Sequence, residues 1–351
     1  MKLLAAGARL HYLLVDLPLD EPLPRDVWVG YQLALQPMQA GADGDWLDHT
    51  HWAPDLCYPG QSTPGFVLPS RIHSLLHGSC RKPHHPGGDG LVEADRLLGR
   101  LLAGGDGQEA SGGAEDLPDW PAVLVMSGDQ VYADDVAGPM LHAIHQLVER
   151  LGLPDETLAG GEAFGVPSAK ALYAHRASFY RRETLLPRQP RNMDLIKVLF
   201  GGVEKPVFTT DSAHNHLISL AEVLAMYLLV WSPAPWALVA HLPTAMVFDD
   251  HDITDDWNLS REWEEVAYGH PFSRRVIGNA LMGYLLNQAW GNRPEAFDAK
   301  LMDGLQAGLA RPGTAAHDGL VDRLLGFGQW HYIWPTQPPL VVVDSRTHRW
   351  R

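Results

Sequence analysis

The chain has 351 residues, of which 46% are hydrophobic and 20% are charged, a composition typical of folded globular proteins and not of disordered ones. Acidic side chains outnumber basic ones by 42 to 27, and the formal net charge of -15 argues against bulk binding to nucleic acid or to an anionic membrane. Only Cys57 and Cys80 are present, so the sequence predicts no disulfide framework and indicates a reducing compartment.

The start of the chain predicts neither a signal peptide nor a twin-Arg signal, because Arg9 interrupts the short apolar run that begins at Met1. The longest apolar stretch, Leu217 to Trp231, is shorter than the roughly 20 residues that span a bilayer, and it contains Glu222. We therefore expect a core helix in this stretch, no membrane span, and a cytoplasmic protein.

Two short runs with alternating apolar and polar residues open the chain, Leu10 to Leu17 and Val27 to Leu35, and they predict strands. We assign residues 1–69 to a partial N-terminal β domain and residues 70–351 to the main domain. The next apolar run, Ile72 to Leu76, predicts a strand that leads into a polar loop.

The main domain then continues with a helix predicted over Leu91 to Leu102, followed by a Gly-rich acidic stretch, 103–119, that we expect to be an exposed mobile loop. A strand, a polar loop and a helix follow each other twice in the rest of the chain. The predicted strands are Ala122 to Met126 and Ala245 to Phe248, the predicted helices are Pro139 to Leu151 and Pro271 to Trp290, and two further strands are expected at Gln329 to Trp334 and Leu340 to Asp344.

An acidic cluster follows the strand that ends at Phe248. Five carboxylates lie between Asp249 and Asp256, and like charges so close together repel one another unless a cation is bound among them. A metal site that includes Asp249 and Asp250 explains the cluster, and a solvated acidic turn is the alternative.

The loop after Met126 contains Gly128, Asp129 and Tyr132. Glycine allows the backbone to turn sharply, so Asp129 would project at the end of the strand where a metal could bind. A phenol ionises near pH 10 in water, but Fe(III) can hold it as phenolate, and Tyr132 is therefore a candidate iron ligand. The alternative is a tyrosine packed beneath the loop.

The segment from His77 to His85 contains a thiol, three imidazoles and two cationic side chains. Cys80 could serve as a metal ligand, a nucleophile or a small buried hydrophobic residue. Arg81 is the better of the two cations for binding phosphate oxygens, because its guanidinium can bind them with two hydrogen bonds. His214, Asn215 and His216 are weak further candidates, and a helix cap is the alternative there.

Three motifs together resemble the PhoD-like alkaline phosphatases: Gly-Ser-Cys-Arg at 78–81, Gly-Asp-Gln-Val-Tyr-Ala-Asp at 128–134 and Asp-Asp-His-Asp at 249–252. Their order and separations agree with that family, and Asp344-Ser345-Arg346 is similar to its Asp-x-Arg segment. The resemblance extends over most of the chain, from His77 to Arg351.

The resemblance implies an α/β fold of the calcineurin-like metallophosphoesterase kind, in which a sandwich of two sheets is flanked by helices (α/β/β/α), here with the partial N-terminal β domain. It implies two metal ions, Fe(III) and Ca(II), with zinc or manganese as alternatives. The implied metal ligands are Cys80, Asp129, Tyr132, Asp250 and Asp249, and the implied catalytic residues are His251 as general acid, Asp252 as the residue that orients its imidazole, and Arg81 as a phosphate-binding cation.

Two departures from the family pattern affect the expected activity. Asp250 stands where relatives have Asn, and the later His-bearing blocks, including Gly-Asp-x-His, have no counterpart. We expect the chain to be an internal piece of a longer protein or the product of a gene shortened at both ends.

The resemblance predicts hydrolysis of a small phosphate ester by in-line attack of a metal-bound hydroxide. The alternative is a catalytically inactive metal-binding fragment or scaffold that lacks the C-terminal ligands. The sequence does not indicate an oligomeric state or a particular substrate.

Overall fold

The computed structural model describes residues 2–36, 38–39, 42–103, 120–175, 182–185, 215–231 and 235–349. His214 and all but the first residue of the predicted loop 103–119 lie outside these ranges. The described residues form a mixed α/β structure, which confirms the expected fold class at this level.

The centre of the fold is a parallel sheet of three short strands, β9 (Leu76–Gly78), β10 (Leu124–Met126) and β11 (Thr244–Met246), with β10 in the middle. Because the strands are parallel, their carboxyl ends meet at one edge of the sheet, and the loops that follow them begin side by side. This edge positions the residues described in the next section.

The first strand of this sheet begins later than the sequence predicted. Hydrogen bonding to the β10 segment starts where the N–H of Ala122 donates to the carbonyl of Ser74 (3.0 Å), and it continues where the N–H of Leu76 donates to the carbonyl of Val123 (3.0 Å). The N–H of Ile72 donates instead to the carbonyl of Gln337, which lies in the turn between the two last strands. Ile72 therefore lies beside that turn, Ser74 already bonds to the β10 segment, and β9 extends into His77 and Gly78.

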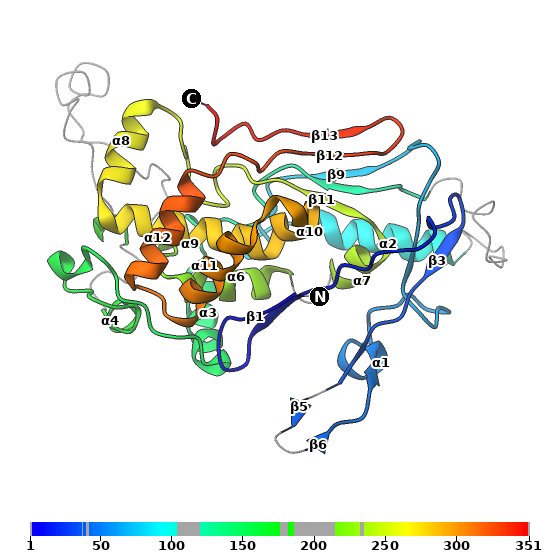
Figure 1. Cartoon of the computed structure of the whole chain (residues 1–351), viewed down its shortest axis with the longest axis horizontal. Coiled ribbons are helices and arrows are strands. Elements are labelled where there is room, and N and C mark those ends of the chain that lie inside the picture. The colour runs from blue at the N-terminus through cyan, green and yellow to red at the C-terminus, as the bar shows by residue number, and fades with distance from the viewer. Residues whose placement is uncertain are drawn as a thin grey trace.

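The two faces of the sheet are covered by different elements, because alternate residues of a strand point in opposite directions. Leu124 and Met126 pack with helices α2 (Gly90–Leu102) and α7 (Pro235–His241). Val123 and Ala245 pack on the other face against the antiparallel hairpin of β12 (Tyr332–Trp334) and β13 (Leu340–Val342). Figure 1 shows the hairpin above the sheet and the two helices below it. The predicted two-sheet sandwich stays a prediction.

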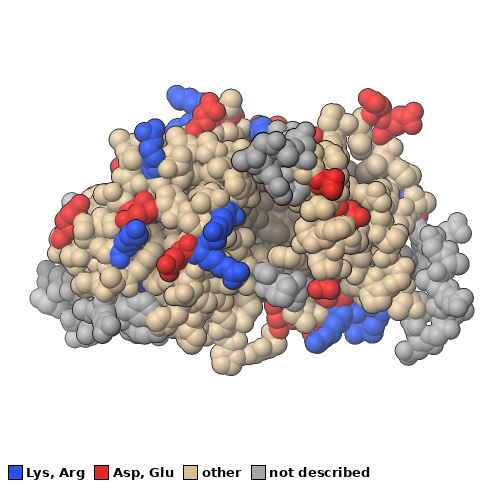
Figure 2. All heavy atoms as spheres, turned by 90° about the horizontal axis from the view of Figure 1, so that it is seen from below, with Lys and Arg blue, Asp and Glu red and all other residues tan. Residues whose placement is uncertain are grey.

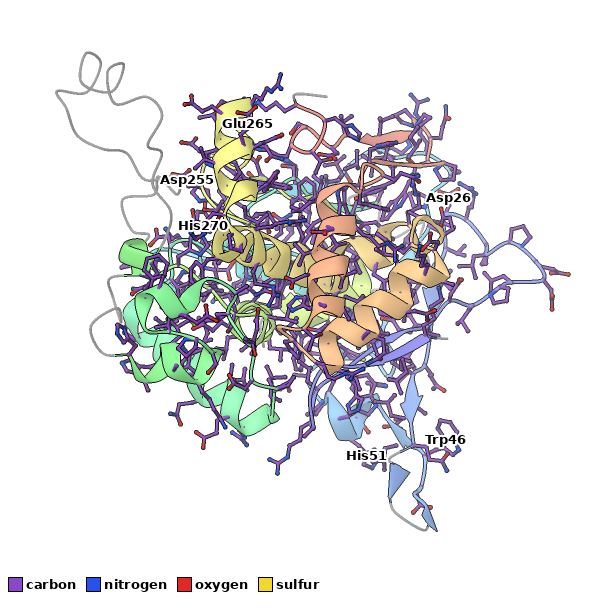
Figure 3. The ribbon with its side chains drawn as sticks, turned by 60° about the vertical axis from the view of Figure 1, so that its left-hand side comes forward. Asp26, Trp46, His51, Asp255, Glu265 and His270 are labelled. Carbon is purple, nitrogen blue, oxygen red and sulfur yellow. The ribbon has the colours of Figure 1, made fainter. Side chains whose placement is uncertain are left out.

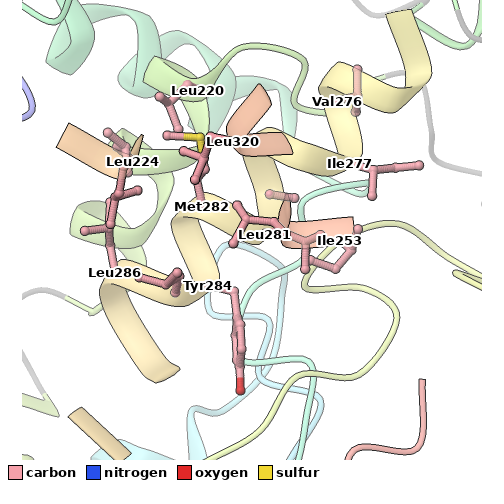
Figure 4. Close-up of a cluster of buried hydrophobic side chains, with 14 of the residues drawn as sticks. Leu220, Leu224, Ile253, Val276, Ile277, Leu281, Met282, Tyr284, Leu286 and Leu320 are labelled. Carbon is pink, nitrogen blue, oxygen red and sulfur yellow. The ribbon is translucent and has the colours of Figure 1, made fainter. Parts of the chain in front are cut away.

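A helical core fills the other half of the molecule. Its centre is α9 (Pro271–Tyr284), whose residues are all buried from Arg275 to Tyr284. Figure 4 shows side chains of α6 (Leu220–Trp231), α9 and α12 (Ala315–Leu325) packed against one another in this core. The remaining helical segments are α1 (His49–Trp52), α3 (Gly138–Leu151), α4 (Ala169–Ala174), α8 (Arg261–Gly269), α10 (Trp290–Asn292), α11 (Ala299–Ala310), 3-10 turns at Gly161–Phe164, Arg182–Leu185 and Pro294–Ala296, and a π-helical turn at Leu285–Ala289.

The predicted core helix at Leu217 to Trp231 is confirmed but begins at Leu220. The hydroxyl of Ser219 accepts a hydrogen bond from the N–H of Glu222 (3.2 Å), and the Glu222 carboxylate accepts one from the N–H of Ser219 (3.1 Å). This reciprocal capping box satisfies free N–H groups at the start of the helix. Among the described residues, no helix has the length and apolar character needed to cross a membrane.

The N-terminal residues form small antiparallel pairs rather than one sheet. Leu4, Ala6 and Leu10, at or near the first hairpin, belong to the same apolar core as the helices. The assignment of residues 1–69 to a separate β domain stays a prediction. The strands of this part are β1 (Lys2–Ala5) with β2 (His11–Leu14), β3 (Trp28–Gly30) with β8 (Gly65–Val67), β4 (Ala34–Leu35) with β7 (Leu47–Asp48), and β5 (Met38–Gln39) with β6 (Ala42–Asp43).

Exposed charges contribute little to holding these elements together. On the face shown in Figure 2, which is hollowed near its centre, acidic and basic side chains are interspersed. Exposed ion pairs such as Arg261 with Glu265 contribute about 0–1 kcal/mol each. Burial of apolar side chains in the helical core is therefore the main stabilising contribution.

Replacement of Leu281, which is fully buried in α9, tests this assignment of the core. We expect Leu281→Ala to lower the free energy of unfolding by about 2–5 kcal/mol, because it removes buried methyl groups and leaves a cavity. Ile333→Ala on β12, where the side chain is 64% exposed, is the control and should change stability by less than about 0.5 kcal/mol. Urea unfolding followed by circular dichroism measures both, and equal losses would contradict the assignment.

Candidate metal centre

Three loops meet at the carboxyl edge of the parallel sheet, and backbone hydrogen bonds join the first two. The N–H of Ser127 donates to the carbonyl of Gly78 (2.9 Å), and the N–H of Cys80 donates to the carbonyl of Gly128 (3.1 Å). The N–H of Arg81 then donates to the carbonyl of Asp129 (2.8 Å). Pairing between the β9 and β10 segments thus continues into their loops and holds Cys80 beside Asp129.

The loop after β11 approaches equally closely at Gly128. This residue has φ +132°, and a Cβ atom placed on it would overlap the side chain of Asp249. Glycine is therefore required for two reasons, the backbone conformation and the contact with the neighbouring loop. The predicted tight turn at Gly128 is confirmed.

Left-handed backbone conformations are concentrated in these loops. Of the five described non-glycine residues with positive φ, four lie here: Cys80 (55°), Asp129 (54°), Asp256 (59°) and Asn258 (57°). Such conformations are uncommon for residues with a Cβ atom and cost free energy, so they persist where the surroundings enforce them. At this edge of the sheet, the chain therefore has residues with a Cβ atom at several positions where glycine would have a lower conformational cost.

The predicted metal ligands converge at this edge. The Cys80 thiol lies 3.4 Å from Oδ2 of Asp129, and the Tyr132 ring stacks on the imidazole of His251. Ligand atoms of Asp129, Asp250 and His251 all lie within 4.8 Å of one another. The described residues therefore bring carboxylates and an imidazole close enough to hold a metal ion.

Further carboxylates extend this group. Asp134, His251 and Asp255 form a second set of ligand atoms within 4.8 Å, and Asp250, Asp255 and Asp256 form a third. Figure 3 shows Asp255 close to α8, whereas His51 and Trp46 of the N-terminal arm lie at the other end of the molecule.

Burial and crowding change the ionisation of these ligands. Burial, which raises the pKa of Asp129, outweighs the lowering by the nearby His251 and acts together with the charges of Asp249 and Asp250, so that the pKa lies at about 6. Burial also raises the pKa of Tyr132 above its ordinary value, as does the charge of Asp129. Without a bound cation the phenol therefore stays protonated.

The imidazole of His251 is held in one orientation by two contacts. Its Nδ1 lies 2.7 Å from Oδ2 of Asp134, and its ring stacks on that of Tyr132 with centroids 4.5 Å apart. Burial lowers the pKa of His251, but the hydrogen bond and charge of Asp134, with the charges of Asp129 and Asp250, outweigh burial and raise it to about 9. The imidazole is consequently a cation at neutral pH.

The prediction that Asp252 orients His251 is wrong, because Asp134 has that role. Asp252 is fully buried, and its Oδ2 accepts hydrogen bonds from the backbone N–H groups of Asp129 (2.7 Å) and Asp249 (3.0 Å). Burial raises the pKa of Asp252 to about 7. Asp252 therefore holds the loops after β10 and β11 together and has no contact with the His251 ring among the hydrogen bonds of the described residues.

Two buried glutamines, which the sequence analysis missed, continue this support. The Gln130 side chain donates to the carbonyl of Val247 (2.8 Å) and accepts from the N–H of Gly128 (3.1 Å). The Gln288 side chain, from the π-helical turn after α9, donates to Asp252 (3.0 Å). The only sequence signal for Gln130 is its place in the polar loop that follows a buried strand.

Arg81 does not lie among the converging ligands, contrary to its predicted role as a phosphate-binding cation. Its guanidinium is buried, forms two hydrogen bonds with Asp89 (3.1 and 2.7 Å), and donates to the carbonyl of Val230. The neighbouring Lys82 pairs with Asp135 and lies over the Tyr132 ring, 4.5 Å from its centroid.

Arg346 is instead the guanidinium at the acidic cluster. Its Nε donates to Oδ1 of Asp249 on the loop after β11, and its Nη2 lies 3.0 Å from Oδ1 of Asp250. The sequence flagged this residue only through the Asp344-Ser345-Arg346 segment. Asp344 explains the segment, since its carboxylate accepts hydrogen bonds from the N–H groups of Arg346 and Thr347 (both 2.9 Å) and so fixes the turn.

The weak candidates Asn215 and His216 contact the site from outside. The Asn215 side chain donates to the carbonyl of Val136 (2.7 Å). His216 is fully buried, and its Nε2 lies 3.0 Å from the hydroxyl of Thr254 in the acidic loop. Neither residue belongs to the three ligand groups, so both help to position the loops.

No protein-family model, curated protein or solved structure matches the chain. The role of this site has to be inferred from its own residues. A groove of about 1060 Å³ lies elsewhere, lined by α3 and α4, and it shares no lining residue with the converging ligands.

Removal of the Asp134 charge tests the electrostatic description of His251. In the metal-free protein we expect Asp134→Asn to lower the pKa of the imidazole from about 9 toward its ordinary value, as measured by NMR titration. Because the folded-state pKa is raised, this pair stabilises the protein fully below about pH 6.5 and loses its effect as the pH rises through about 9.

The difference in unfolding free energy between the wild type and Asp134→Asn should therefore shrink between about pH 6 and pH 10. Asp45→Asn, an exposed residue of the N-terminal arm, is the control and should leave the titration unchanged. An unchanged His251 pKa in Asp134→Asn would contradict the description.

Proposed function

We propose that the protein is a metal-dependent phosphoesterase of the PhoD-like kind, which hydrolyses phosphate monoesters or diesters. The observation that supports this most directly is the convergence of Cys80, Asp129, Asp250 and His251 from three strand-end loops. A thiol, two carboxylates and an oriented imidazole at one edge combine metal-binding donors with a proton donor.

The chemistry of the donor atoms fits both expected metal ions. Cys80, Asp129 and Tyr132 would hold Fe(III) through sulfur and oxygen, and the oxygens of Asp249 and Asp250 would hold Ca(II). Zinc or manganese would accept parts of the same set. Ions bound there would polarise the phosphoryl group and lower the pKa of the attacking water.

His251 supplies the proton in this proposal. Asp134 keeps the imidazole protonated at neutral pH and fixes its plane against the Tyr132 ring. A cation held in this way can donate a proton to the oxygen of the leaving alcohol as the ester bond breaks. In this proposal Tyr132 has two roles: its phenolate binds a metal ion, and its ring stacks on the imidazole of His251, the general acid.

A second candidate function is an inactive metal-binding scaffold, and Arg346 is the observation that favours it. Its guanidinium neutralises Asp249 and Asp250, which would otherwise bind the second ion. Arg81, which would otherwise bind phosphate, is engaged by Asp89. Metal content and turnover, measured on the same preparation, separate the two functions.

Replacement of His251 tests the enzymatic proposal. With bis(4-nitrophenyl) phosphate and 4-nitrophenyl phosphate as substrates, we expect His251→Asn to lower kcat by about 100-fold or more with metal content unchanged, because the proton donor is lost. His73→Asn, at an exposed position, is the control. Bound metal without turnover in the wild type would support the scaffold, and absence of bound metal would sink both candidates.

Replacement of Tyr132 tests the identity of one ion. Phenolate bound to Fe(III) absorbs visible light by charge transfer, so the iron-loaded wild type should be coloured and Tyr132→Phe should lose the band. Tyr268→Phe, outside the ligand groups, is the control and should keep it. A colourless iron-loaded wild type would show that Tyr132 does not bind the iron.

A further inference from the structure

A cleft of about 700 Å³ lies beside the candidate metal centre. Its walls are the edge strand β9, helix α2, and the loop that joins them, and its floor includes Leu124 and Met126 of β10. Cys80 lines the cleft and also lies 3.4 Å from the Asp129 carboxylate. The cleft and the metal centre therefore meet at this residue.

The lining of the cleft is largely apolar. Leu76, Leu91, Ala94 and Leu97 add aliphatic surface to the two side chains of β10. On α2, Ala94 and Leu97 are three residues apart and lie on the same face of the helix as Glu93 and Arg100, which also line the cleft. A ligand there would be recognised chiefly through burial of apolar surface.

The acidic groups of the cleft are paired with cations of the protein. Asp89 binds Arg81 (2.7 Å), and Glu93 pairs with Arg96. Repulsion between an anionic ligand and these carboxylates is therefore reduced, and Arg100 adds a positive charge at the end of α2. The cleft tolerates an anion that carries an apolar substituent.

The joining loop leaves this space open. A Cβ atom placed on Gly87, Gly88 or Gly90 would meet no other atom within 4 Å. Gly87 and Gly88 of the loop and Gly90, the first residue of α2, thus form a part of the wall without side chains. A substituent as large as an aryl ring would enter the cleft without displacing protein atoms at these positions.

From this arrangement we propose that the cleft binds an apolar aryl or alkyl substituent of the phosphate ester, with the phosphoryl group placed at the metal centre next to Cys80. This inference rests on the proposed function and gives its substrate class, which is an organophosphate with a hydrophobic alcohol. Burial of one phenyl ring there would strengthen binding by about tenfold, as estimated from the apolar area removed from water.

The test measures equilibrium binding and turnover with matched small and large ligands. Calorimetry on the metal-loaded protein compares the binding of phenylphosphonate with that of methylphosphonate. Neither compound has an ester bond that this reaction could hydrolyse, so both stay intact during the measurement. Kinetics compare phenyl 4-nitrophenyl phosphate with methyl 4-nitrophenyl phosphate, which share one leaving group. For the wild type we expect about tenfold tighter binding of phenylphosphonate and a correspondingly lower KM for the phenyl diester.

Variants of α2 locate the effect. Ala94→Trp should fill the cleft and remove the preference for the phenyl ligands, while the values for the methyl ligands stay unchanged. Ala94→Leu, a smaller change, should reduce the preference in part, so the test does not depend on one bulky variant. Ala143→Trp makes the same substitution at an exposed position of α3 that does not line the cleft, and it should keep the wild-type preference.

The inference would be overturned if the wild type bound the two phosphonates equally tightly. It would also be overturned if Ala94→Trp weakened the binding of both phosphonates by the same factor. Failure of the proposed function looks different. In that case neither diester is hydrolysed, and the phosphonate comparison still decides whether the cleft binds an apolar substituent.

Discussion

The buried carboxylate of Asp252 is the interaction on which the rest of the site depends. It accepts backbone hydrogen bonds from the loops after β10 and β11 and a side-chain hydrogen bond from Gln288. A carboxylate in the interior is tolerated only when its oxygens are satisfied, so the two loops and the π-helical turn have to close on it together. Asp252 thereby joins the sheet edge to the helical core, and the positions of Asp129 and Asp249 follow from it.

Crowded negative charge is the second constraint. Three carboxylates, those of Asp129, Asp249 and Asp250, lie close enough to influence one another's ionisation. The chain offsets this repulsion with two cations of its own, Arg346 and the imidazolium of His251. A metal ion and Arg346 would compete for the same oxygens, and the guanidinium therefore stabilises the loop in the metal-free state.

Much of this arrangement could be predicted from local sequence patterns, because strands and helices follow from periodicity and caps. Helices α2 and α3 begin within one residue of their predicted starts. The partners of His251 and Arg81 could not be predicted in this way. His251 and Asp134 are 117 residues apart, whereas the adjacent Asp252 is an attractive but wrong partner, since its side chain points into the interior. Arg81 is held away from the acidic cluster by its ion pair with Asp89. Local sequence predicts at most that Asp89 caps the start of α2, and it does not predict this ion pair.

Backbone strain adds an independent argument that these side chains are present for their chemistry. Cys80 and Asp129 adopt left-handed conformations that cost roughly 1–2 kcal/mol for a residue with a Cβ atom. Glycine at either position would relieve that cost, as it does at Gly128 between the loops. Glycine would also remove the thiol or the carboxylate. The hydrogen bonds between the β9 and β10 loops hold both residues in place against the strain, which is the arrangement expected where donor atoms have to be presented at a fixed position.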